Sequence, residues 1–469
     1  MGGVPVHHGS RKVILESFPY RLRRKLATKL LGRPLSRLAA AGRAGPAARL
    51  MQSQLVTLAE PSFSTGAVTA LMLPKPGFSE DIMASLCRDG RFRVLALDRA
   101  YSKFVYRAFL PKTVDDNNYR SAAPEHDDAK AELREFWSKA WPTLGRDIDV
   151  VLTGNFSYHA EQEMTAALEA QGTPLVALHK ECLKSPALET FYEDVYRQRK
   201  IPFQGRRVAT YNAIERDIQV RAGMVPPERI SVTGMARLDR IHAWRQDFAG
   251  ARRRTGARPK ALFMSFNPRT GAPLISRKLP GRREILDEGL EALGWDGLVR
   301  DSHAAMVRLA ERAPDIDVVI KTKDHARALA VLEESFGQGF KPPANLDFVV
   351  GGDPFAQITA ADVLCGFNST SLFEALAANV PVVLPLFAEA AAPATQGYVV
   401  DLGRAAGRAA SVDELVERLA EGARANHAAG HATELAEDQA AALEHWLGNA
   451  DGAAGARVAA LVHEVATGP

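Results

Sequence analysis

A short run of polar side chains, Asn368–Ser371, is the first feature that could do chemistry. It lies in the stretch CGFNSTSLFEALAANVPVVLP (365–385), where an apolar segment ends and a helical pattern begins. The unpaired N–H groups in the first turn of a helix suit a phosphate, and short hydroxyl side chains let it approach. Glu374, one turn further, could accept hydrogen bonds from the two hydroxyls of a ribose. The alternative is ordinary capping, because Ser371 and Glu374 also fit the S-x-x-E capping box.

A second concentration of charge is the run LHKECLKSP (178–186), which directly follows an apolar segment. Charged groups at the end of a buried strand are costly to bury without a purpose. Glu181 and His179 are therefore candidates for a general base, and Lys180 and Lys184 for cations that hold an acid or a phosphate. The alternative for His179 is a structural role at a strand end.

Other polar residues follow apolar runs in the same way. Asn155 and His159 in TGNFSYHAEQE (153–163) would border the edge that holds the 178–186 run, whereas Glu161 and Glu163 fit the first turn of a helix. Another apolar run ends near Ser265 and Asn267, in FMSFNPRTG. A further one ends near Lys321 and Lys323, in IKTKDH. The lysines are either cations for a leaving phosphate or a solvated strand end.

The elements that must position these residues alternate between short apolar runs and amphipathic stretches. Apolar runs without polar alternation predict buried parallel strands, and the stretches between them predict covering helices. The runs fall into two series, separated by the charged Gly- and Pro-containing segment 252–260. We therefore predict an α/β fold of two doubly wound Rossmann-like domains that face each other across a cleft. Ligands should bind at the carboxyl ends of the strands.

The predicted division of the chain follows from this alternation. Residues 1–50 form a basic head, 51–250 a first Rossmann-like domain, 251–450 a second Rossmann-like domain, and 451–469 a helix that packs back on the first domain. Within the first domain the pattern predicts an irregular segment at 99–124 and a helix at 127–141 that Pro142 stops.

Composition excludes several classes of protein. At 469 residues the chain is too long for one core, and 46% hydrophobic with 24% charged residues is typical of a globular protein. No apolar run is long enough to span a membrane. The three cysteines lack disulfide or metal spacing, which favours a reducing cytoplasm.

The charge is unevenly distributed. Residues 1–50 hold eleven of the 59 Lys and Arg residues but only one of the 55 acids, Glu16, so the remainder of the chain is net acidic. An acidic body argues against nucleic acid as a partner. The basic head also carries Leu22, Leu26 and Leu30, and residues 11–43 are interpreted as a peripheral helix attracted to anionic lipid. A disordered basic tail and a transit peptide are the alternatives.

The motifs in combination resemble a known family. Together they are similar to GT-B-fold glycosyltransferases over roughly residues 66–450. The motifs that carry this similarity are LVALHKECLKSP (175–186), SVTGMARLDRI (231–241), VVIKTKDHARA (318–328) and the stretch 351–385. The resemblance is nearest to the branch that builds bacterial surface carbohydrate, with Kdo-transferase-like, capsule-synthesis and CDP-glycerol-transferase-like proteins. Non-hydrolysing nucleotide-sugar 2-epimerases share much of this layout.

The resemblance implies roles residue by residue. Asn368, Ser369 and Thr370 match the donor-phosphate positions, and Glu374 matches the ribose-binding acid. Further donor-side positions are Gly234, Arg237, Ser265, Asn267, Lys321 and Lys323. Many relatives have a His-Pro pair where this chain has Asp324 and His325, so no role is carried over to His325. The D-x-D metal motif of the other common glycosyltransferase fold is not evident, because the two DID runs (147–149 and 315–317) each lead into a predicted buried strand. We therefore expect no metal, and no cofactor beyond the nucleotide-sugar co-substrate.

The implied activity is a metal-independent transfer of a sugar, with Kdo from CMP-Kdo as the first donor class, to a surface polysaccharide or glycolipid. The resemblance implies that the 51–250 domain binds the acceptor and the 251–450 domain binds the nucleotide sugar. Glu181 or His179 would be the base. The implied partners are the nucleotide-sugar donor, the glycan or glycolipid acceptor and anionic lipid, and the implied place is the cytoplasmic face of the inner membrane. The alternatives are a nucleotide-sugar 2-epimerase and a non-catalytic partner in glycan synthesis with the same fold.

Overall fold

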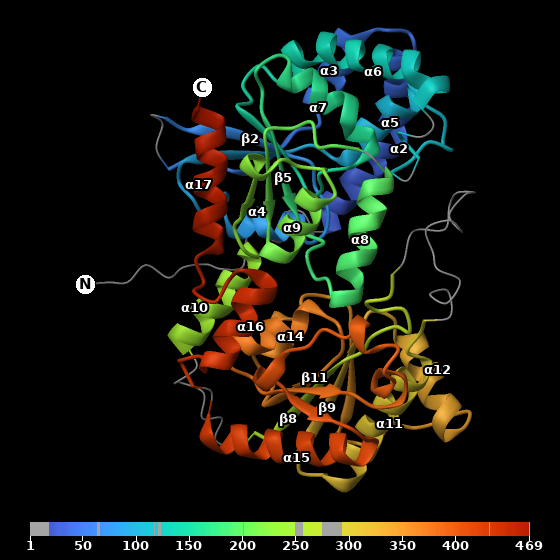
Figure 1. Cartoon of the computed structure of the whole chain (residues 1–469), viewed down its shortest axis with the longest axis vertical. Coiled ribbons are helices and arrows are strands. Elements are labelled where there is room, and N and C mark those ends of the chain that lie inside the picture. Colours follow the sequence, from blue (N-terminus) through green and yellow to red (C-terminus); the bar gives the residue numbers. More distant parts are fainter. Residues whose placement is uncertain are drawn as a thin grey trace. The chain divides into compact units, whose positions relative to one another are not determined.

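The computed structural model describes residues 18–62, 66–116, 118–120, 123–199, 201–248, 257–273, 293–430 and 432–468. The chain divides into two compact units, with labels as in Figure 1. Unit 1 comprises residues 1–182, 193–237 and 453–469, and unit 2 comprises residues 183–192 and 238–452. In the part of the chain that is described, no helix is long and apolar enough to cross a membrane.

Unit 1 is built on a seven-stranded sheet with the order β1-β3-β2-β4-β5-β6-β7. Every neighbouring pair is parallel except β1 and β3. The strands are β1 (Val56–Ala59), β2 (Val68–Met72), β3 (Phe92–Ala96), β4 (Val150–Thr153), β5 (Leu175–His179), β6 (Arg207–Thr210) and β7 (Ile230–Val232). Both β4 and β5 are buried along their whole length, as expected of strands covered on both faces.

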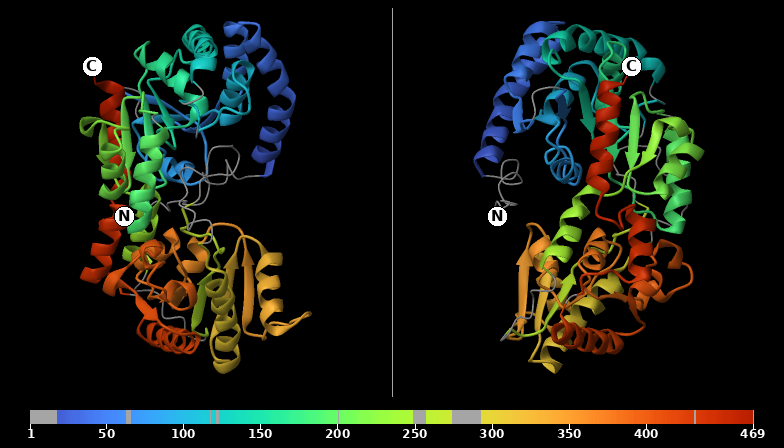
Figure 2. Two further views of the ribbon diagram at one scale, coloured as in Figure 1. Left: turned by 45° about the vertical axis from the view of Figure 1, so that its right-hand side comes forward. Right: turned by 90° about the vertical axis from the view of Figure 1, so that its left-hand side faces the viewer.

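Helices cover this sheet. They are α2 (Phe18–Ala40), α3 (Ala44–Gln52), α4 (Phe78–Ala84), α5 (Arg99–Phe109), α6 (Ala123–Leu144), α7 (Gln162–Glu169), α8 (Pro186–Arg199), α9 (Ala213–Arg221) and α17 (Ala454–Thr467). The C-terminal α17 lies against α4, β2 and β4, where Val458 and Val462 join the buried core of unit 1. The long α2, blue in Figure 2, packs along α5, and Ser36 Oγ donates to Phe104 O at 3.1 Å.

Two local expectations for unit 1 are wrong. Residues 99–109 form the regular helix α5, capped by Asp98, whose carboxylate accepts from Ala100 N at 2.9 Å. Pro142 does not stop α6, which continues to Leu144. A proline cannot donate to the carbonyl four residues earlier. That carbonyl, Ser138 O, instead accepts from Gln171 Nε2 at 3.2 Å, so the helix tolerates the proline.

Unit 2 has a six-stranded sheet, all parallel, with the order β10-β9-β8-β11-β12-β13. The strands are β8 (Lys260–Met264), β9 (Asp317–Thr322), β10 (Leu346–Val350), β11 (Val363–Cys365), β12 (Val382–Pro385) and β13 (Gly407–Ala409). The helices are α10 (Asp239–Phe248), α11 (Asp296–Arg312), α12 (His325–Phe336), α13 (Phe355–Ile358), α14 (Thr370–Ala377), α15 (Val412–Ala429) and α16 (Glu437–Leu447).

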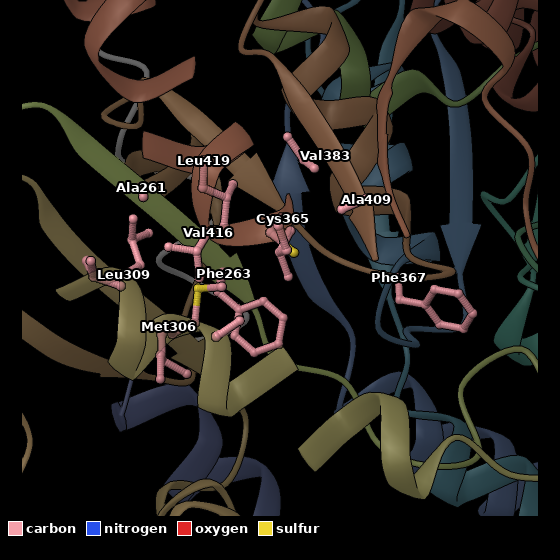
Figure 3. Packing of buried hydrophobic residues seen from close by; sticks show 14 of the residues in the cluster. Ala261, Phe263, Met306, Leu309, Cys365, Phe367, Val383, Ala409, Val416 and Leu419 are labelled. Atoms are coloured by element: carbon pink, nitrogen blue, oxygen red, sulfur yellow. The ribbon is translucent and has the colours of Figure 1, made fainter. Parts of the chain in front are cut away.

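One face of the second sheet packs against α11 and α15. Phe263 and Cys365 of the sheet lie in one buried cluster with Met306 and Leu309 of α11 and Leu419 of α15 (Figure 3). Helix α14 packs on β11 and β12 but contributes nothing to this cluster; it lies instead beside α10, α13 and α16. The two doubly wound α/β units confirm the predicted fold class. The division between the units falls at residues 237 and 238, and the 252–260 segment lies largely outside the described residues.

Candidate functional site

The polar run after β11 lies at the switch point of the second sheet. Strands β8 and β11 are neighbours, and the strands that follow each in the chain, β9 and β12, lie on opposite sides of this pair. Loops after such a pair diverge and leave a crevice where ligands bind in doubly wound sheets. The two loops touch here, because a Cβ on Gly271 would lie 2.4 Å from Asn368 Nδ2. The topology therefore brings Ser265 and Asn267 to the same sheet edge as Ser369 and Thr370.

The start of α14 has a different cap from the one that the S-x-x-E pattern predicts. Its N-cap is Ser369, whose side chain accepts from Ser371 N at 3.3 Å, while Ser369 Oγ and Ser371 Oγ lie 2.8 Å apart. Ser371 is thus inside the helix, and the capping box with Glu374 does not form. Glu374 is only 8% exposed, within a helix that is buried from Ser371 to Ala377. The Ser371–Glu374 capping box therefore does not account for the carboxyl group of Glu374 at this position.

Asn368 has a structural task in the same turn. Its backbone is left-handed, with φ at 45°. Its Nδ2 donates to Tyr398 O at 2.8 Å, and its Oδ1 accepts from Val400 N at 2.8 Å. The side chain therefore holds the 398–400 segment against the turn, and a bound phosphate would meet Ser369 and Thr370 rather than this amide.

Ser265 is oriented by a buried histidine. The Nδ1–H of His303 donates to Val299 O at 2.7 Å, so its Nε2 accepts from Ser265 Oγ at 3.0 Å. Burial lowers the pKa of His303 to about 4, which keeps the ring neutral at physiological pH. Asn267 is used locally, because its Oδ1 accepts from Arg269 N at 2.8 Å and shapes the loop.

The lysines of the 318–328 run differ from each other. Lys321 is 6% exposed and its Nζ donates to Gly351 O, and its pKa is lowered mainly by burial. Lys323 is exposed just beyond β9. His325 is also exposed at the start of α12, with its ring edge-to-face with Phe348 at 4.9 Å. Lys323 is thus the lysine that a leaving phosphate could reach without a change in the sheet.

The switch point of the first sheet gathers cations that the sequence did not single out. Strands β2 and β4 are neighbours, and their following strands β3 and β5 lie on opposite sides. Lys75, after β2, donates through Nζ to the hydroxyl of Tyr158, after β4, and lies 4.4 Å from its ring centroid. The Arg99 guanidinium, after β3, lies 3.7 Å from the same ring and pairs with Glu161 at 2.6 Å.

His179, one of the two base candidates, is enclosed in the protein. It is 1% exposed, and its Nε2 lies 3.0 Å from Glu215 Oε1 in a carboxyl group with no exposure. The same oxygen accepts from Tyr196 Oη at 3.0 Å and from Gln219 Nε2 at 2.8 Å. Phe156 packs edge-to-face on His179 at 5.3 Å. This imidazole is therefore buried beside a hydrogen-bonded network around Glu215 at the end of β5.

Glu181, the other candidate, lies at the surface. Its carboxylate is 59% exposed and its Oε1 is 3.1 Å from Lys180 Nζ. The turn that carries both residues is pinned by Cys182, whose Sγ donates to His179 O at 3.0 Å and whose O accepts from Asn212 Nδ2 at 3.0 Å. Lys184 falls in the 183–192 segment, which belongs to unit 2, and its Nζ lies 4.3 Å from the centroid of the Tyr192 ring.

Asn155 and His159 follow β4 in unit 1. Asn155 Oδ1 accepts from Ser157 N at 2.9 Å, and His159 Nδ1 lies 2.6 Å from Asp116 Oδ1. Burial alone would raise the pKa of Asp116, but the hydrogen bonds and charge of His159 hold it below its ordinary value. Glu161 and Glu163 are buried partners of arginines, through Arg99 and Arg134 respectively.

Gly234 and Arg237 also belong to the edge of the first sheet. Gly234 takes a left-handed φ of 86° in the turn after β7. The Nη1 of Arg237 donates to Asp81 Oδ2 at 2.9 Å and to Tyr211 Oη at 2.6 Å. Asp81 is 3% exposed, and burial raises its pKa despite this partner. The contacts give Arg237 a positioning role between α4 and the loop after β7.

The structure thus forms two separate polar edges, one in each unit. Missed by the sequence analysis were Lys75 and Arg99, and with them Asp81 and Tyr211. The signal that the sequence offers for them is weak. Lys75, Arg99 and Tyr211 each follow an apolar run, and Asp81 lies in the first turn of the helix that comes next. Among the residues described, no group of three or more His, Cys, Asp or Glu could hold a metal ion.

Comparisons with known proteins give remote likenesses. Neither a protein-family model nor a curated protein sequence matches the chain. Among solved structures, a glycotransferase of kitacinnamycin is 16% identical with a TM-score of 0.44, over 87% of this chain and 99% of that one. A UDP-GlcNAc 2-epimerase from Neisseria meningitidis is 12% identical with a TM-score of 0.44, over 84% and 99%. A trehalose 6-phosphate synthase from Burkholderia multivorans is 12% identical with a TM-score of 0.42, over 86% and 96%.

Proposed function

We propose that this chain is a glycosyltransferase that uses a nucleotide sugar, with unit 2 binding the donor and unit 1 the acceptor. The observation that carries the proposal is the β11–α14 turn. A helix N-terminus with Ser369 and Thr370 in its first positions stands at the sheet's switch point, and Glu374 follows one turn later without forming a capping box. This arrangement suits a donor phosphate at the helix end and a ribose near Glu374.

Unit 1 supplies a base for the transfer. The exposed Glu181 would take the proton of an acceptor hydroxyl while its oxygen attacks the anomeric carbon. The bond from that carbon to the donor phosphate breaks, and the nucleotide leaves with the electron pair. Ser369, Thr370 and the N–H groups of α14 would stabilise the phosphate charge. His179 would hold the β5 turn in place rather than touch the substrate.

The donor and acceptor classes follow the sequence resemblance. We propose a CMP-linked donor, with Kdo as the sugar, and a surface polysaccharide or glycolipid as acceptor. The first test is thermal unfolding with CMP, CDP, UDP and GDP, because a ligand at 100 times its Kd adds about 2.7 kcal/mol of stability. Stabilisation by CMP above the others supports the donor class, and stabilisation by none of the four contradicts donor binding.

The epimerase alternative differs in its product. An epimerase converts the nucleotide sugar without an acceptor, whereas a transferase releases free nucleotide only as the acceptor is glycosylated. Incubation of the protein with a nucleotide sugar alone, followed by NMR of the sugar ring, separates the two. An epimerised sugar in that sample would overturn the transferase proposal.

We also propose that α2 contacts anionic lipid at the inner face of the membrane. Leu26 and Leu30 are 51% and 68% exposed, one turn apart. The exposed face that they share also carries four cations and no acid: Lys25, Lys29, Arg33 and Arg37. Exposed leucines beside cations are typical of a helix that lies in a lipid interface. Residues 11–17 of the predicted contact lie outside the described part of the chain.

The lipid contact is tested with vesicles that contain phosphatidylglycerol. The double variant L26A/L30A should lose binding, while Val350→Ala, which shortens an apolar side chain 54% exposed in unit 2, should retain it. Binding should also fall with salt, because the attraction is partly electrostatic. Equal binding by both variants would contradict the role of α2.

A further inference from the structure

The edge of the first sheet holds two lysines near one another. Lys75 belongs to the loop after β2, and Lys180 to the turn after β5, two strands away in the sheet order. Gly77 shows how close they come: it is left-handed, with φ at 82°, and a Cβ there would lie 3.1 Å from Lys180 Cδ and 3.5 Å from its Nζ. The Lys180 side chain therefore lies directly against the loop that carries Lys75.

Neither ammonium group forms a buried ion pair with a carboxylate in the described part of the chain. In the described part of the chain no carboxylate lies within ion-pair distance of Lys75, whose Nζ donates to the Tyr158 hydroxyl. The carboxylate beside Lys180 is that of Glu181, which is 59% exposed and so largely solvated. Arg99 adds a third cation, but Glu161 compensates its charge at 2.6 Å.

The electrostatics of this arrangement favour an added anion. The pKa of Lys75 is lowered, first by burial and then by the charges of Lys180 and Arg99, and the smaller opposite effects of Glu181 and Asp116 do not cancel this. Like charges held close together in a half-buried site are stabilised by a negative ligand between them. The Tyr158 hydroxyl accepts from Lys75, so its own hydrogen is available as a donor to the same ligand.

We propose that Lys75 and Lys180 bind an anionic group of the acceptor, a phosphate or a carboxylate, beside Glu181. The inference rests on the proposed function, because it identifies the substrate class of the acceptor site. The ligand would place its charged oxygens between the two ammonium groups and the Tyr158 hydroxyl. A neighbouring hydroxyl of the same molecule would then lie at Glu181. The acceptor is accordingly a phosphorylated or carboxylated sugar or polyol.

Isothermal titration tests the subsite with glucose 6-phosphate, glucuronate and inorganic phosphate as probes. The K75M and K180M variants should each weaken binding at least tenfold, and the double variant should abolish it. K75R and K180R keep the charge and should bind within a few fold of wild type, which separates lost charge from lost folding. The control is K103M, which removes an exposed lysine from α5 of the same unit and should change nothing.

Each outcome is informative. Binding of the phosphates alone assigns a phosphorylated acceptor, and binding of glucuronate alone assigns a carboxylated one. The proposal is overturned if no probe binds wild type, or if K75M/K180M binds as tightly as K103M does. Thermal unfolding with the four nucleotides is measured on the same preparations. If no nucleotide stabilises the wild-type protein while the anionic probes still bind, the proposed function is refuted but the anion subsite is retained.

Discussion

The two polar edges of this protein handle charge in opposite ways. The edge of unit 1 carries charged side chains from several strand ends, with Lys75, Arg99 and Arg237 stacked on or bonded to tyrosines. In the described part of unit 2, the switch point presents the hydroxyls of Ser265, Ser369 and Thr370, with Glu374 one turn into α14 and the exposed Lys323 beyond β9. The turn before α14 thus presents mainly backbone N–H groups and hydroxyls, whereas the edge of unit 1 presents mainly full charges.

This difference suggests a division of labour. A helix N-terminus holds a phosphate through partial charges that do not depend on pH, which suits a donor bound in the same way in every cycle. Ammonium and carboxylate groups can bind an anion and move a proton, which suits the acceptor side. If this division holds, substitutions in unit 2 should change nucleotide binding, and substitutions in unit 1 should change anion binding and proton transfer.

The largest expected effect is on the base. Glu181→Gln should lower kcat by about 10²- to 10⁴-fold, because it removes the proton acceptor while keeping the shape. Nucleotide binding, measured by titration, should be unchanged, since Glu181 belongs to unit 1. The matched variant is His179→Gln, which should mainly lower thermal stability by disturbing the buried Glu215 network. A His179 variant that melts like wild type yet loses more activity than Glu181→Gln would reverse the assignment.

Acid should destabilise unit 2 through two buried histidines. Burial lowers the pKa of both His242 and His303 to about 4, and Arg245 adds to the effect on His242. The unfolded chain takes up these protons near the ordinary pKa of 6.5, so stability present above pH 6.5 is lost as the pH falls toward 4. Each shift corresponds to about 3 kcal/mol. Unit 2 should then exchange its amide hydrogens before unit 1.

Hydrogen exchange followed by mass spectrometry between pH 7 and pH 4 measures this acid effect in each unit. His303→Gln should reduce the pH dependence in unit 2, although it will also lower stability at neutral pH. The control is His325→Gln, because that ring is exposed at the start of α12. The same acid response in the His303 and His325 variants would contradict the assignment.

The overall fold followed from the sequence because parallel strands leave a simple signal. The apolar runs 174–178 and 318–320 show no polar alternation, and both lie in strands that are buried almost throughout. Helix α5 was missed because its buried face uses Tyr101, Val105 and Tyr106 instead of leucines. The passage of α6 through Pro142 depends on a hydrogen bond from Gln171, which no local pattern contains.

The candidate site was less predictable for a topological reason. The 368–374 run is continuous in the sequence, so its cap and acid could be seen at once. The edge of unit 1 is assembled from Lys75, Arg99, Tyr158 and Lys180, which are separated by many residues and meet only through the strand order. Burial was equally hidden: His179 and Glu181 are two residues apart, yet one is enclosed and the other exposed.

The edge of unit 2 should respond to the loss of the Glu374 carboxylate. Glu374→Gln should weaken nucleotide binding by about 10- to 100-fold, since hydrogen bonds to a charged group are worth about 1.5–3 kcal/mol. Anion binding at Lys75 and Lys180 should be unaffected. The matched control is Glu417→Gln on the exposed face of α15. Nucleotide affinity equal to that of the control would remove Glu374 from the proposed ribose contact.

The smallest expected effects are those of replacing one glycine at each sheet edge by alanine. These two variants also give the most direct comparison of the two edges. Gly77 and Gly271 are both left-handed, with φ of 82° and 70°, so alanine should cost about 1–2 kcal/mol at either position. Beyond that cost the two sites differ. A Cβ on Gly77 would meet the flexible stem of Lys180 at 3.1 Å, whereas one on Gly271 would meet Asn368 Nδ2 at 2.4 Å.

Asn368 cannot yield easily, because both ends of its amide are bonded to the 398–400 backbone. G271A should therefore lose more stability than G77A in urea unfolding, by about the 0.5–1.5 kcal/mol of one hydrogen bond. It should also weaken nucleotide binding, while G77A should weaken only the binding of anions. If the two alanine variants lost the same stability and the same ligand, the edges would not be independent sites, and the assignment of donor to one unit and acceptor to the other would fail.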